Sequence, residues 1–201
     1  MQTMKANPIY SRRSIRKFAD KSVSIELINE ILDAGRMAPS AKNRQPWKYI
    51  VFGNEKKKEL LYHMKQGLIR EKQGIPLLPE SGFGLPDAEN TLRIMQEAPI
   101  LIIVINTNGH SPFLPIDSDG RVTEMCDLLS IGASIENMLL AAENLGLGTL
   151  WIANTCFAYT EIMEYLKISG QLVGAVAVGY ADERPLQRPR KEAEEMVTYR
   201  L

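Results

Sequence analysis

A cluster of cations near the N-terminus is the first feature of this chain that could perform chemistry. The stretch SRRSIRKF carries Arg12, Arg13, Arg16 and Lys17, although the formal net charge of the whole chain is zero. The planar guanidinium fork of arginine matches the oxygens of a phosphate, and Ser14 adds a hydroxyl to the same run. The cluster therefore predicts an anion-binding site, and a solvated helix face is the simpler alternative.

A second basic segment lies far downstream. The stretch RPLQRPRK contains Arg184, Arg188, Arg190 and Lys191, and its prolines restrict the backbone. Two arginine clusters that flank an α/β body indicate one phosphate held from two sides. A non-catalytic module that binds an anion or nucleic acid is an alternative. The balance of 24 basic and 24 acidic residues argues against nucleic acid as a partner.

The stretch PSAKNRQPW is a third candidate element. Pro39 and Pro46 bracket a turn in which Ser40, Asn43 and Gln45 supply hydroxyl and amide groups. Such groups suit the donor and acceptor edge of a planar heterocycle. An ordinary turn that leads into a strand is the alternative interpretation.

Histidine and cysteine offer little catalytic potential here. His63 and His110 are the only histidines, and neither has a carboxylate or cysteine neighbour at metal-ligand spacing. Cys126 and Cys156 lie among apolar residues, which favours structural thiols in a reducing compartment. The sequence therefore predicts no metal site and identifies no catalytic side chain. An enzyme of this kind often depends on an organic cofactor.

Alternating helical and strand patterns must position these groups. The long apolar helix at 121–146 exceeds one hydrophobic stripe, so a partner subunit is expected to cover part of it. Gly146 ends this helix rather than opening a dinucleotide loop, because GLGTLW precedes a strand. The glycines and prolines of 67–88 predict a long loop or lid. Other helices are expected at 24–38, 55–66 and 160–167, and strands at 47–54, 99–106, 149–154 and 172–180.

The N-terminal segment MQTMKANPIY has no apolar core typical of a signal peptide. The longest apolar run, 98–105, is far shorter than the roughly 20 residues that a membrane-spanning helix needs. These patterns predict a cytoplasmic protein without a membrane partner.

The order and spacing of RRSIRKF, PSAKNRQPW and GYADERPLQRPRK resemble the nitroreductase family of FMN-dependent flavoenzymes. The resemblance covers residues 8–54 and 122–197. It implies an α+β fold with a mixed β-sheet flanked by helices, in a single domain over 1–201 with a variable lid or insertion at about 67–95. It also implies a homodimer with the long helix at its interface and two FMN sites between the subunits.

The resemblance also assigns roles to individual residues. Pro39, Ser40 and Asn43 would reach the FMN of the partner subunit. The residues expected to hold the FMN phosphate, ribityl chain and pyrimidine edge are Arg12, Arg13, Ser14, Arg16, Arg188 and Arg190.

The flavin ring is expected to lie beside the segment 150–154, which includes Leu150 and Ile152. Asn90 and Arg93 of the stretch NTLR match a family element that contacts the ring edge. Some members carry a Glu-Gly pair near the reactive nitrogen, where this chain has Ala-Asn at 153–154. This departure concerns the orientation of the substrate rather than FMN binding.

The resemblance implies ping-pong chemistry in which NADH or NADPH reduces FMN and a small-molecule acceptor is then reduced. Nitroaromatics, quinones and similar acceptors are the expected substrates. The alternatives within the same fold are reductive dehalogenation, flavin fragmentation and enoate reduction.

Overall fold

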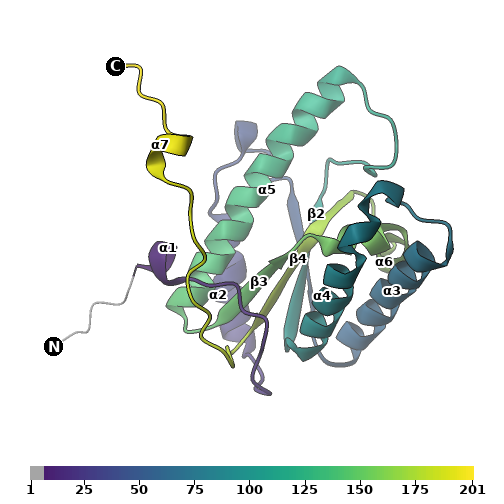
Figure 1. Ribbon diagram of the computed structural model, residues 1–201, viewed down its shortest axis with the longest axis horizontal. Helices are drawn as coiled ribbons and strands as arrows, with labels where there is room; N and C mark the ends of the chain where they lie inside the picture. The colour runs from purple at the N-terminus through teal and green to yellow at the C-terminus, as the bar shows by residue number, and fades with distance from the viewer. Residues whose placement is uncertain (1–6) are drawn as a thin grey trace.

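The computed structural model describes residues 7–201 and has an α+β architecture (Figure 1). Residues 1–6, part of the segment for which no signal peptide is predicted, lie outside the described residues. One four-stranded sheet has the order β1-β2-β4-β3, and all of its strand pairs are antiparallel. The only parallel element of this sheet among the described residues is an isolated bridge between Ser14 and Thr149. The strands are β1 (Trp47–Phe52), β2 (Ile100–Asn106), β3 (Gly148–Ile152) and β4 (Gln171–Gly179).

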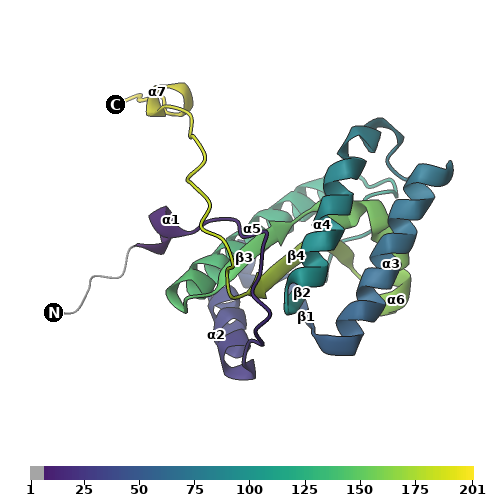
Figure 2. The ribbon, with the colours of Figure 1, turned by 60° about the horizontal axis from the view of Figure 1, so that its bottom comes forward.

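The sheet separates two hydrophobic layers (Figure 2). One face packs against α3 (Asn54–Gln73), α4 (Leu85–Glu97) and α6 (Tyr159–Leu166), and the other against α2 (Ile25–Arg36) and α5 (Ser118–Asn144). The central strand β2 is apolar over ILIIVI because residues on both of its faces are buried. The predicted α+β class is therefore confirmed, as are the strands expected near 99–106 and 172–180.

Local capping explains where two helices on the same face begin and end. The Ser24 hydroxyl accepts the amide N–H of Leu27 at the start of α2. The Asp117 carboxylate accepts the amide N–H of Gly120 at 2.7 Å and begins α5. Gly146 follows α5 with φ of +76°, which confirms the predicted helix end, because a side chain is strained in this left-handed conformation.

The prediction of a long loop over 67–88 is wrong. Helix α3 continues to Gln73, a 3-10 turn follows at Pro79–Gly84, and α4 begins at Leu85. Gly67 lies inside α3, where a Cβ atom would come within 2.3 Å of the Ala158 Cβ atom. This glycine therefore serves close packing between α3 and the 3-10 turn Asn154–Ala158, and it does not mark a loop.

Helix α5 is only partly covered. Within residues 7–201 it is the one helix long and apolar enough to cross a membrane, but 44% of its apolar window is buried inside the molecule. A buried core helix passes the same test, so the property alone is weak evidence for a membrane span. Val122, Met125 and Leu129 on this helix remain exposed. The C-terminal segment, with the short helix α7 (Ala193–Met196), extends away from the body (Figure 1).

Candidate functional site

The two basic clusters of the sequence meet in one concave site, which we call the arginine pocket. The N-terminal run and the segment after β4 face each other across a cavity of about 150 Å³. The sequence prediction that these clusters lie together is therefore met by the geometry. The residues that line the arginine pocket are Arg12, Arg13, Ser14, Arg16, Pro185, Leu186, Gln187, Arg188 and Arg190.

Backbone pairing to the sheet brings these two segments together. The Ile15 amide donates to the Thr149 carbonyl oxygen at 2.9 Å, next to the parallel bridge at Ser14. Phe18 forms a second bridge, with Ala181, just after β4. The Glu183 carboxylate accepts the amide N–H groups of both Arg16 and Lys17. The edge of the sheet thus fixes both arginine-bearing segments.

The positive charge of the arginine pocket is poorly compensated. The buried Nε atom of Arg12 has no hydrogen-bond partner within residues 7–201 and lies 3.6 Å from the Glu136 carboxylate. Arg13 donates to three backbone carbonyls, among them that of Tyr10 at 2.8 Å. Among the described residues, no carboxylate lies within 4 Å of the guanidinium groups of Arg13, Arg16, Arg188 or Arg190. A buried donor without a hydrogen bond, beside four arginines that have no carboxylate partner in the described chain, fits a phosphate group.

A second cavity of about 240 Å³, which we call the strand-edge pocket, adjoins the arginine pocket. Arg16 lines both cavities, so its side chain lies at the boundary between them. Leu150 and Ile152 of β3 form one wall, as expected, and α4 forms the other. The complete lining is Arg16, Asp87, Asn90, Thr91, Ile94, Leu150, Trp151, Ile152, Ala153 and Asn154.

The α4 wall of the strand-edge pocket is polar. The Asn154 side-chain amide donates to the Asp87 carboxylate at 2.8 Å and to the Thr91 hydroxyl at 3.1 Å. Asn90 lines the pocket and accepts hydrogen bonds from Arg93. The Arg93 side chain also pairs with Glu97 and is not part of the lining. Of the two residues expected at the ring edge, only Asn90 therefore faces the cavity.

Sequence reasoning did not identify Asp87 and Thr91 as part of this wall. Together with Asn90 they have the i, i+3, i+4 spacing that places side chains on one face of a helix. That signal was hidden because 67–88 was expected to be a loop.

The turn that contains Pro39, Ser40 and Asn43 lies apart from both pockets of its own chain. It packs on α5, where the Ala41 amide donates to the Ser130 hydroxyl at 3.1 Å. The backbone is strained, because Lys42, Asn43 and Gln45 have φ values of 53°, 53° and 48°. Strained non-glycine residues of this kind concentrate at functional sites.

A buried ion pair holds the strained turn. Arg44 donates from Nε and Nη2 to the same Asp127 oxygen, at 2.9 and 2.7 Å, and Asn108 donates to the other oxygen at 3.2 Å. The side chain of Asp127 is 1% exposed. The hydrogen bond to Asp127 raises the pKa of Arg44 above its ordinary value.

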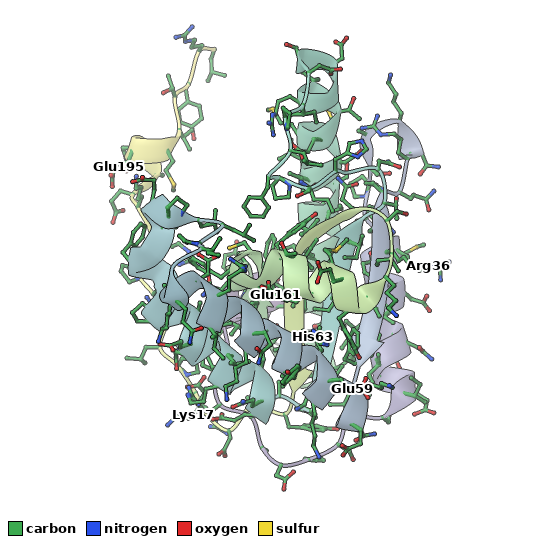
Figure 3. The ribbon with its side chains drawn as sticks, turned by 90° about the vertical axis from the view of Figure 1, so that its right-hand side faces the viewer. Lys17, Arg36, Glu59, His63, Glu161 and Glu195 are labelled. Carbon is green, nitrogen blue, oxygen red and sulfur yellow. The ribbon has the colours of Figure 1, made fainter. Side chains whose placement is uncertain are left out.

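The histidines and cysteines lie outside these pockets. Figure 3 shows His63 on α3, where its ring stacks on Tyr165 with centroids 4.6 Å apart. Burial raises the pKa of the Cys156 thiol, which favours its neutral form. Within residues 7–201 no group of three or more His, Cys, Asp or Glu side chains could hold a metal ion.

Comparison with known proteins identifies the fold and the family. Residues 9–180 match the Nitroreductase family, and the chain therefore belongs to the nitroreductase family. A crystal structure of a provisionally named nitroreductase from Desulfovibrio desulfuricans, in complex with FMN, superposes with a TM-score of 0.70. Its sequence is 25% identical, and the match covers 96% of this chain and 95% of that one.

Curated relatives match to different extents. A protein of Methanothermobacter thermautotrophicus with the provisional name NADH dehydrogenase/NAD(P)H nitroreductase is 33% identical over 71% of this chain. The match spans 57% of that protein's length, and 64% of a similar protein from Archaeoglobus fulgidus. The nitrobenzene nitroreductase of Ectopseudomonas oleovorans is 26% identical, over 95% of this chain and 94% of its own length.

Proposed function

We propose that this chain is an FMN-dependent oxidoreductase that takes electrons from NADH or NADPH and reduces nitroaromatics, quinones or similar small acceptors. The observation that carries the proposal is that Arg16 lines both the arginine pocket and the strand-edge pocket. The arginine pocket suits a phosphate, and the strand-edge pocket offers space along β3 for a planar ring. A planar cofactor that carries a phosphate needs both. The relatives support it, since one is an FMN complex and others are named for NAD(P)H or nitrobenzene.

The arginine pocket would hold the FMN phosphate. Arg12, Arg188 and Arg190 line this pocket. Within the described chain, no carboxylate accepts a hydrogen bond from their guanidinium groups. Arg13 and Ser14 complete the same lining. A phosphate monoester carries close to two negative charges. Several arginine side chains held in place can donate charge-assisted hydrogen bonds to its oxygens.

The strand-edge pocket would hold the flavin ring, with Leu150 and Ile152 along it and Asn90 at its edge. When bound, FMN supplies the hydride chemistry. Arg16 lines both pockets and would stabilise the negative charge that develops on the flavin when it is reduced. A cation stabilises an anion most strongly where water is partly excluded. No side chain is assigned as a general acid or base.

We propose further that the active form is a homodimer in the cytoplasm, where reduced nicotinamides are supplied. The exposed apolar side chains of Val122, Met125 and Leu129 on α5 would be covered by the second subunit. Pro39, Ser40 and Asn43, which are remote from the pockets of their own chain, would then complete the partner's FMN site. Arg93 is proposed only as a support for Asn90, with which it bonds.

The visible absorption spectrum of the purified protein tests the proposal. We expect flavin bands that are released as FMN on denaturation and are bleached by NADH or NADPH without oxygen. The double variant R12E/R190E should lose FMN. The control R36E changes an exposed arginine that pairs with Asp33 and lines neither pocket, and it should retain FMN (Arg36 is labelled in Figure 3). A colourless protein that also takes up no added FMN would overturn the assignment.

A further inference from the structure

The α4 wall of the strand-edge pocket carries a polar arrangement that points to the kind of acceptor the enzyme takes. This inference rests on the proposed function, because it assumes that the acceptor enters the pocket beside the flavin. Two segments far apart in the sequence form the arrangement: Asp87 and Thr91 on α4, and Asn154 after β3. All three line the cavity.

The hydrogen bonds fix the orientation of the Asn154 amide. A carboxylate accepts hydrogen bonds and cannot donate them, so the Asn154 atom that faces Asp87 must be the NH₂ nitrogen. The same nitrogen donates to the Thr91 hydroxyl at 3.1 Å, which occupies its second hydrogen. The side chain of Asn154 therefore has only its carbonyl oxygen, an acceptor, left to offer a ligand.

The charge of Asp87 is not neutralised by a cation. Among the described residues, no Lys, Arg or His nitrogen lies within 4 Å of its carboxylate. Asp87 lies in the first turn of α4, where the helix dipole stabilises a carboxylate without cancelling its charge. Arg16 is the one cationic side chain among the residues that line this pocket, and it also lines the arginine pocket, where the proposed cofactor would engage it.

We propose that this Asp87–Asn154 wall makes the enzyme select neutral, hydrogen-bond-donating aromatic acceptors over aromatic carboxylates. An amide, hydroxyl or amine group on the acceptor can donate to the Asp87 carboxylate or to the Asn154 carbonyl oxygen. A carboxylate at the same place meets the like charge of Asp87 and finds only an acceptor on Asn154. Asp87 is the specificity-determining residue in this account.

Matched ligand pairs test the proposal. Calorimetric titration of the FMN-loaded protein with benzamide and benzoate compares a neutral donor with a carboxylate of the same shape, without turnover. The ratio of kcat/KM for 4-nitrobenzamide and 4-nitrobenzoate gives the corresponding kinetic preference. We expect the wild type to favour the amide in both assays, and we expect the preference to weaken as salt is raised.

The variant D87N removes the charge and keeps an oxygen that can accept from Asn154. It should lower the amide preference about fivefold, since a partly exposed charge acts weakly over several ångströms. The control E89Q removes a carboxylate from the same helix, but Glu89 pairs with Lys72 and does not line the pocket. E89Q should leave the preference unchanged.

The outcomes separate this inference from the proposed function. A protein that binds FMN and is reduced by NAD(P)H, but favours benzoate or keeps its preference in D87N, overturns the role of the wall alone. An equal shift in D87N and E89Q also overturns it, because the effect would then be one of general charge. Failure to bind FMN overturns both proposals together.

Discussion

The buried ion pair between Arg44 and Asp127 gives the sharpest test of how the strained turn is held. The variant D127N keeps the shape of the side chain and removes its charge. Two Arg44 nitrogens donate to one carboxylate oxygen and Asn108 donates to the other. An asparagine at 127 would have to direct its NH₂ group at one of these donors, so one side of the network loses its acceptor.

The structure sets the expected magnitude. Breaking a buried ion pair by removing one partner costs about 3–5 kcal/mol, and hydrogen bonds to charged groups contribute about 1.5–3 kcal/mol each. Asp127 is almost fully enclosed, but the Arg44 side chain is 27% exposed and can recover some water contacts. We therefore expect D127N to lower the free energy of unfolding by about 3 kcal/mol, the lower end of the range.

Urea unfolding at a fixed protein concentration, with and without FMN, measures this change. The matched control is D33N, which removes a carboxylate from the exposed Arg36–Asp33 pair and should cost less than about 1 kcal/mol. FMN affinity should also fall in D127N, because the turn at 39–45 is proposed to complete the partner's site. A loss of stability in D127N no larger than that in D33N would refute the structural role of the buried pair.

Three further changes test other parts of the fold. G67A should destabilise the protein by about 1–3 kcal/mol in the same urea assay, because its Cβ atom would overlap Ala158, whereas G82A, with open space around it, should have little effect. Burial raises the pKa of Tyr49, so the protonated phenol stabilises the fold below pH 10 and this stabilisation is lost as pH rises further. The variant Y49F has no ionisable phenol, so its free energy of unfolding should fall less than that of the wild type between pH 9 and 11. Because burial raises the pKa of Cys156, its reaction with a thiol reagent in a C126S background should be slow at pH 8, and a rate equal to that of a small free thiol would contradict this.

Most elements of the fold are predictable from local pattern. The apolar run of β2 predicts a strand buried on both faces, Ser24 predicts the start of α2, and Gly146 predicts the end of α5. These signals are strong because each depends on the chemistry of a few neighbouring residues. Gly67 shows the limit of local pattern, since its role depends on Ala158, which lies in a distant part of the chain.

The candidate site shows the same difference between what local sequence predicts and what depends on distant contacts. The two arginine-rich segments, and the match between guanidinium groups and a phosphate, are evident from the residues alone. The folded chain was needed to see that Arg16 lines two pockets and that Asp87 meets Asn154 across 67 positions of the chain. The physical reason is that residue type determines which interactions a side chain can make, while pairing with the sheet edge and packing between helices determine which partner it reaches.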